Sequence, residues 1–113
     1  MPNNPQVTIT IVNGAIQVSS GSVSISKSGN SPSLGTQVIW QNNTGGSATV
    51  NFVVSGSATK TTSPFSNNSF DIQNNASQPS GRVNSGANAG STSYPYSITA
   101  GSLTLDPDVI VEN

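Results

Sequence analysis

The stretch Gln37–Phe52, QVIWQNNTGGSATVNF, decides how this chain folds. It holds the single tryptophan, Trp40, inside a short β-branched run, followed by a polar Gly-Gly turn and a second run in which apolar and polar residues alternate. Alternation with a period of two is typical of a strand with one buried face. We therefore predict two strands here, Gln37–Asn42 and Ala48–Val54, joined as a hairpin around which the other strands assemble.

Further strand-like runs lie on both sides of this pair, and no window carries the 3.6-residue apolar repeat of a helix. The other predicted strands are Val7–Val12, Ala15–Val18, Ser22–Ser26, Tyr94–Ile98, Ser102–Leu105 and Asp108–Glu112, the last of them buried. Asn13-Gly14 predicts either a tight hairpin or a loop between strands of different sheets. Lys27–Thr36 is rich in glycine, serine and proline and is predicted to be a loop.

The segment from Ser55 to Ser93 has weaker signals. Pro64-Phe65 and Phe70–Ile72 supply apolar anchors, Arg82-Val83 favours a short strand, and the remainder predicts turns and loops. Short strands separated by Gly, Pro and Asn turns are typical of a sandwich or barrel. The 113 residues correspond to one domain, predicted to span 1–113.

The composition excludes several classes of partner. Hydrophobic residues make up 32% of the chain, charged residues only 6%, and the net charge is -1. Lys27, Lys60 and Arg82 are the only cations, too few to neutralise a nucleic-acid backbone or to bind an anionic membrane surface. No apolar run approaches the ~18 residues of a membrane span. We therefore predict no nucleic-acid binding and no membrane insertion.

The chain offers little information on its compartment. The first residues, MPNNPQ, contain neither a basic region nor an apolar run, so no signal peptide is predicted within this chain. The chain has no cysteine, so its sequence does not indicate whether the compartment is oxidising or reducing. A surface of Ser, Thr, Asn and Gly favours an exported or cell-surface domain, although these residues are also ordinary in strands and turns.

The order of these motifs resembles cupredoxin-like domains, the Greek-key β-sandwiches typified by small blue-copper proteins. The matching parts are VTITIV, VIWQNN with its turn into TVNF, the phenylalanine-rich segment from Ser63 to Phe70, and the closing YPYSI and LTLDPDVIV. The closing stretch also resembles small bacterial cupredoxin-like proteins of no assigned activity. The resemblance covers most of the chain and implies an all-β, Greek-key β-sandwich of the cupredoxin type.

The copper ligands of that family have no counterpart here. A blue-copper site needs two imidazoles, a thiolate and a weak axial ligand that is often methionine. The resemblance puts Ala48 near the position of the first histidine and Ser97 near that of the cysteine, and the only methionine is Met1. The chain has no histidine and no cysteine. We therefore predict no copper site, and we expect neither another metal nor a cofactor.

Other chemistry has weak support from the sequence. Asp106, Asp108 and Glu112 could supply oxygen ligands for Ca²⁺, but Asp-Pro-Asp is also an ordinary turn, which is our prediction. A serine triad lacks its imidazole, and a Ser-Lys pair would have to use Lys27 or Lys60, which lie in no recognisable motif. A carboxylate pair for glycoside hydrolysis would draw on four acids, three of them clustered near the chain end. We predict no catalytic residues and no enzyme activity.

Binding remains the favoured class of function. We predict a non-enzymatic structural or interaction domain without copper, whose partner is a protein or a carbohydrate. The alternative is a carbohydrate-binding or adhesive module in which Trp40, Tyr94 and Tyr96 act as stacking platforms, although aromatic strand residues usually pack in a core. A third hypothesis is self-association through edge strands, because the charges that blunt such edges are scarce.

Overall fold

The computed structural model describes residues 4–29, 33–52 and 63–113, and it contains no helix in this part of the chain. The strands are β1 Gln6–Val12, β2 Ala15–Val18, β3 Ser22–Ser26, β4 Ile39–Asn42, β5 Ala48–Asn51, β6 Ser69–Ile72, β7 Ser77–Pro79, β8 Thr92–Pro95, β9 Ser97–Ala100, β10 Leu103–Leu105 and β11 Asp108–Glu112. The predicted all-β class is therefore confirmed.

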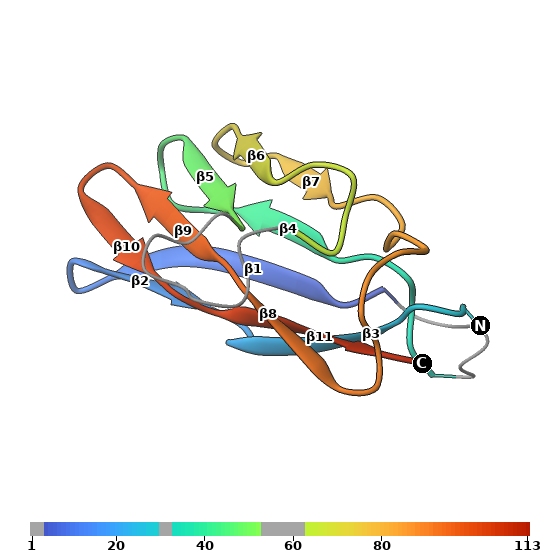
Figure 1. Cartoon of the computed structure of the whole chain (residues 1–113). Helices are drawn as coiled ribbons and strands as arrows, with labels where there is room; N and C mark the ends of the chain where they lie inside the picture. The colour runs from blue at the N-terminus through green and yellow to red at the C-terminus, as the bar shows by residue number, and fades with distance from the viewer. Residues whose placement is uncertain (1–3, 30–32, 53–62) are drawn as a thin grey trace.

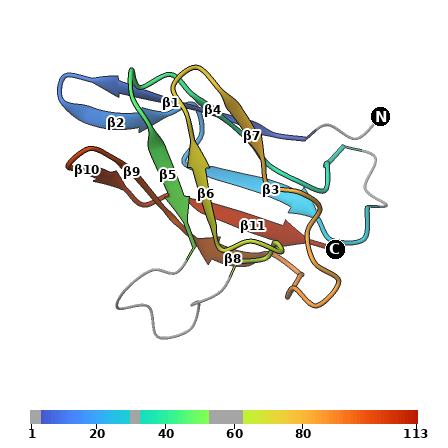
Figure 2. The same cartoon turned by 90° about the horizontal axis from the view of Figure 1, so that it is seen from above.

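The strands form three sheets, with the orders β2-β1-β4-β7, β10-β9-β5-β6 and β3-β11-β8 (Figure 1). The second and third sheets are continuous, because β8 leads into β9 and β10 leads into β11. At the bend between them, the Tyr96 backbone N–H donates a hydrogen bond of 3.0 Å to the Pro107 carbonyl. These two sheets make one bent layer that packs against the first sheet, an arrangement consistent with a β-sandwich (Figure 2).

Two of the strand pairings are parallel. β4 lies parallel to β1, with Thr8 opposite Gln41, and β11 lies parallel to β3, with Ser24 opposite Ile110. The other strand pairings of the described residues are antiparallel. Parallel neighbours require a long connection between them, so both pairings bring together segments that are distant in the sequence.

The core lies between the two layers and follows the period-two pattern of the strands. Val7 and Ile9 of β1 face Val50 and Ile98 of the opposite layer, and all of these side chains are fully buried. Val109 of β11, which is paired on both sides, is also fully buried. The prediction of a buried strand at the end of the sequence is therefore confirmed.

The Asn13-Gly14 turn joins β1 and β2 as a tight hairpin. Val12 pairs with Ala15 across the turn, and Asn13 and Gly14 have φ angles of 53° and 77°. Positive φ at both central residues is the geometry that a two-residue hairpin needs to match the strand twist. Of the two structures predicted for Asn13-Gly14, a tight hairpin and a loop between different sheets, the hairpin is therefore confirmed.

The predicted hairpin between Gln37–Asn42 and Ala48–Val54 is wrong. β4 and β5 both form, but β4 belongs to the first sheet and β5 to the second. The turn at Thr44–Ser47 carries the chain from one layer to the other, because the polar side chain of Asn42 binds the turn and holds it at the edge of the core. Val53 and Val54 lie outside the described residues.

Three smaller predictions also need correction. Ser77–Pro79 was expected to be a loop but forms β7 on the open side of β4, an edge position where proline is tolerated. Arg82-Val83 is not a strand, because Val83 makes a single backbone bond, to Thr36, and is held by burial. The strand predicted over Tyr94–Ile98 is divided at Tyr96, where the chain passes between sheets.

Candidate functional site

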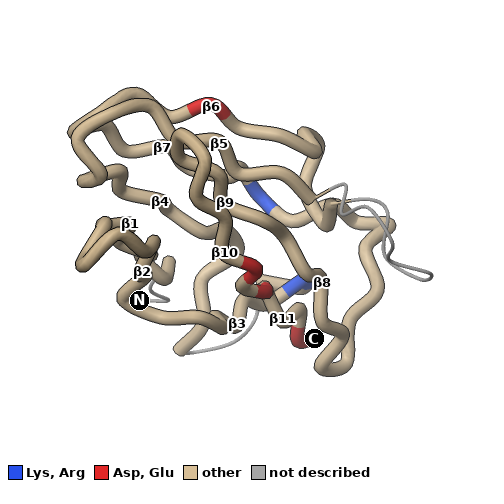
Figure 3. Tube along the Cα trace, turned by 90° about the vertical axis from the view of Figure 1, so that its left-hand side faces the viewer, with Lys and Arg blue, Asp and Glu red and all other residues tan. Residues whose placement is uncertain are grey.

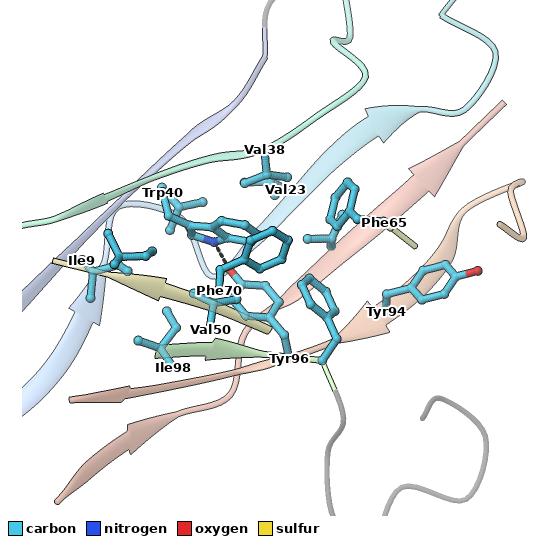
Figure 4. Close-up of a cluster of buried hydrophobic side chains, with 14 of the residues drawn as sticks. Ile9, Val23, Val38, Trp40, Val50, Phe65, Phe70, Tyr94, Tyr96 and Ile98 are labelled. Atoms are coloured by element: carbon cyan, nitrogen blue, oxygen red, sulfur yellow. Dashed lines mark hydrogen bonds between the residues drawn. The ribbon is translucent and has the colours of Figure 1, made fainter. Parts of the chain in front are cut away.

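Trp40 and Tyr96, two of the three predicted stacking platforms, lie at the centre of the core. Both side chains are 0% exposed. The Trp40 indole Nε1–H donates a hydrogen bond of 3.2 Å to the Tyr96 hydroxyl, and the ring centroids lie 5.7 Å apart (Figure 4). This bond satisfies the polar group of each ring inside the protein. Rings enclosed in this way present no face to a ligand, and here they join the two layers.

The remaining aromatic side chains are also core residues. Phe52, Phe65 and Phe70 surround the Trp40 ring, with centroids 6.2, 6.4 and 5.1 Å from it. All aromatic residues of the sequence fall within the described ranges, and the most exposed of them, Phe70 and Tyr94, show only 5% of their surface. Recognition of a sugar by stacking on an exposed ring therefore has no platform in the described residues.

Burial raises the pKa of Tyr96 to about 12 from its ordinary value of 10.0, while the hydrogen bond from Trp40 lowers this pKa and the charge of Asp108 raises it. The unfolded chain therefore loses the Tyr96 proton at a lower pH than the folded chain. Folding stability should be fully present below about pH 10 and should fall by roughly 2–3 kcal/mol as the pH rises toward 12.

A Tyr94→Phe variant allows this pH dependence to be measured, because Tyr96 is then the only tyrosine. We expect its phenolate absorbance to appear at a higher pH in the folded protein than in urea. Equal midpoints in the two solvents would contradict the buried position of Tyr96. Urea titrations at increasing alkaline pH should show the matching loss of stability.

Tyr94, the third predicted platform, lies apart from the Trp40–Tyr96 pair. Its hydroxyl group points away from that pair and accepts a hydrogen bond of 2.7 Å from the Asn88 backbone N–H (Figure 4). The ring is buried, but it lines an open hollow between the turns at 63–68 and 84–88. The structure therefore separates Tyr94 from the two platforms with which the sequence grouped it.

Asn42 organises the end of the sandwich where β4 turns into β5. The side chain is fully buried, and its Oδ1 accepts hydrogen bonds from the Thr44 N–H at 3.0 Å and the Thr44 hydroxyl at 2.7 Å. Its Nδ2 donates to the carbonyls of Gly46 and Ile72, at 2.8 and 2.9 Å. The four bonds match the full hydrogen-bonding capacity of the amide. This residue was missed by sequence reasoning, although its position two residues after Trp40 indicates an inward-facing amide.

The same end of the sandwich contains the position that the family resemblance links to the first copper histidine. Ala48 opens β5 and is buried against the core. Ser97 does not meet it, because Ser97 pairs with Asn51, three residues further along β5. Continuing that register brings Ala100, also buried, opposite Ala48. Ala48 and Ser97, the positions that the resemblance links to two copper ligands, therefore do not lie opposite each other. The buried methyl groups of Ala48 and Ala100 lie together at this end of the β5–β9 pair instead.

Along the Cα trace, one acidic position lies on β6 and the others lie near β10 and β11 (Figure 3). Asp71 lies on β6 and accepts a hydrogen bond from Thr49, whereas Asp108 and Glu112 belong to β11 and accept bonds of 2.6 Å from the hydroxyls of Ser93 and Ser91. Within residues 4–29, 33–52 and 63–113, no three acidic, histidine or cysteine side chains gather closely enough to hold a metal ion. Asp106 is exposed after β10, and Lys60 lies outside the described residues.

Taken together, the strands form an all-β structure of several sheets around an aromatic core, consistent with a β-sandwich. Comparison of the chain with protein-family models, with curated proteins and with solved structures finds no match. A search of the described residues also finds no helix with the length and apolarity needed to cross a membrane.

Proposed function

We propose that this chain is a cupredoxin-like domain without copper chemistry that serves as a non-enzymatic structural or interaction domain. The observation that carries the proposal is the end of the sandwich around Asn42 and Ala48. There, each polar group of the Asn42 side chain binds the protein itself, and the neighbouring inward positions are alanines. The Asn42 side chain therefore stabilises the fold and has no polar group left to bind a metal or a substrate.

The path of the chain supports a Greek-key topology. A Greek key consists of antiparallel strands in which one strand returns through a long connection to lie beside an earlier one, and β9 returns in this way beside β5. Two further returns are parallel: β4 lies beside β1 after the chain has visited β3 in the other layer, and β11 lies beside β3 near the end of the sequence. These two long-range returns, together with the order of the VTITIV, VIWQNN and LTLDPDVIV motifs, favour the cupredoxin type of sandwich.

The polar groups on the outer faces of the sheets support a role in binding a partner. The outer face of β5, β9 and β10 carries Thr49, Thr99 and Thr104 in register across the sheet. Asp71 of β6 continues this row beside Thr49 and supplies its one charge. The outer face of β1 and β4 carries the uncharged residues Thr8 and Gln41. Such neutral hydroxyl and amide groups can form hydrogen bonds with a partner but cannot act as acids or bases near neutral pH.

Addition of a further strand is less well supported at β7, β6 and β3, because these three outer strands are blunted. β7 is three residues long and ends in Pro79, which cannot donate to a ladder. β6 carries the charge of Asp71, and the end of β3 is covered where Ser26 N–H donates to Gly35. Short strands, proline and charge all limit edge-to-edge association. The proposed contacts therefore use the faces and turns of the domain.

Copper titration tests the proposed absence of copper chemistry. We expect that adding Cu(II) in the presence of glycine as a weak competitor produces no saturable 1:1 complex and no change in Trp40 fluorescence. The reason is that imidazole and thiolate ligands are absent from the sequence. Stoichiometric binding that withstands glycine and quenches Trp40 would contradict the proposal.

A further inference from the structure

A hollow with a volume of about 600 Å³ lies between two turns beside β8. Its nine lining residues come from both turns and from β8, and they include Phe65, Asn68, Ser85, Asn88 and Tyr94. Small-molecule sites commonly have volumes of about 300–1,000 Å³, so this hollow is large enough for a ligand of one or two rings.

Hydrogen bonds fix the two turns relative to each other. The Asn84 backbone N–H donates to the Pro64 carbonyl at 2.8 Å, and the Ser66 hydroxyl lies 3.2 Å from the Asn84 Oδ1. Below the rim, Phe65 and Ala87 are buried in the core. The hollow is therefore preformed, which lowers the entropic cost of binding.

The rim offers hydrogen-bonding groups that no residue of the described ranges binds. The Asn68 Oδ1 accepts a bond of 3.0 Å from the Ser63 backbone N–H, which fixes that amide and leaves its Nδ2 as a donor. The Ser85 and Asn88 side chains are exposed, and no hydrogen bond within the described part of the chain engages them. The rim thus combines amide donors with groups that both donate and accept.

The charge and shape of the hollow narrow the class of ligand. None of the lining residues is charged, so an ionic ligand would lose hydration without gaining a counter-charge. An apolar ligand would remove water from the rim amides without replacing their hydrogen bonds. The rings of Phe65 and Tyr94 are at least 95% buried, so stacking contributes little. A neutral molecule bearing several hydroxyl groups fits these conditions.

We propose that this hollow binds a neutral saccharide unit, held by hydrogen bonds from its rim instead of by stacking. A saccharide presents neighbouring hydroxyls that both donate and accept, as the Asn68, Ser85 and Asn88 groups require. Of the nine lining residues only Tyr94 belongs to a strand, so the hollow offers an extended peptide no run of strand backbone with which to pair. The inference deepens the proposed interaction role by naming a ligand class for it.

Titration of ¹⁵N-labelled full chain with a panel of neutral mono- and disaccharides tests the inference by NMR. At least one sugar should shift the amide signals of residues 63–68 and 84–88 in a saturable way, with a dissociation constant in the millimolar range. Glucuronate and glucosamine, which carry charge, should bind more weakly than their neutral counterparts. Saturable shifts confined to another surface, or no saturable shift with any sugar, would overturn the inference.

Two variants make the assignment specific. The double substitution Ser85→Ala with Asn88→Ala should weaken binding about tenfold, because two rim groups are lost. Gln17→Ala, a substitution of an exposed amide on β2, should leave binding unchanged. Unchanged binding by the double variant, with its spectrum still that of a folded protein, would contradict the site. A negative result here leaves the copper titration unaffected, so the two proposals fail independently.

Discussion

Replacing Asn42 with aspartate is expected to remove a large share of the folding stability of the chain. The aspartate retains acceptors for Thr44 but loses the two donors to the carbonyls of Gly46 and Ile72. It also places a charge at a position with no solvent exposure. Breaking such a buried polar arrangement costs about 3–5 kcal/mol. This is a large share of the roughly 5–15 kcal/mol that stabilises an ordinary domain.

Urea denaturation followed by Trp40 fluorescence measures this loss, and Asn43→Asp provides the matched control. Asn43 is the next residue, is exposed, and uses its Oδ1 to accept a bond from Gln41, which aspartate can also accept. The control should change the free energy of unfolding by no more than about 0.5 kcal/mol. If both substitutions destabilise the chain equally, the network around Asn42 is not the cause.

Trp40→Ala should cost about 3–5 kcal/mol, because it removes the largest fully buried side chain and leaves a cavity between the layers. It also leaves the Tyr96 hydroxyl without the indole donor. Far-UV circular dichroism during urea denaturation is the suitable measurement, since the variant contains no tryptophan.

Val12→Ala is the control for the loss of apolar volume at a strand position. Val12 is 42% exposed near the hairpin tip, so its truncation should cost no more than about 1 kcal/mol. Trp40→Phe should fall between the two, because most of the ring contacts remain while the hydrogen bond to Tyr96 is lost. A Trp40→Ala cost as small as that of Val12→Ala would contradict the central position of the indole.

The strands that could be predicted are those in which alternation is uninterrupted. VTITIV, AIQV, SVSIS and VIVE became β1, β2, β3 and most of β11, because each pattern specifies both an extended chain and one inward face. Alternation does not specify which sheet a strand joins. For that reason alternation could not distinguish a β4–β5 hairpin from the observed passage between layers, which depends on the contacts of Asn42.

The candidate sites were less predictable than the strands. Trp40 and Tyr96 were identified as both core and ligand candidates, and only burial distinguishes the two roles. The hollow beside Tyr94 could not be anticipated, because its walls come from turns about 20 residues apart, in a segment without periodicity. Polar turn residues carry information about local backbone shape, not about which other turn they meet.

Interstrand NOE contacts measured by NMR in the full chain test the strand topology most directly. The observed register predicts backbone contacts between Thr8 and Gln41 and between Ser24 and Ile110, in the pattern of parallel neighbours. Those contacts would establish the two long-range returns on which the proposed sandwich topology rests. Antiparallel contacts between β4 and β5, with none between β4 and β1, would contradict it.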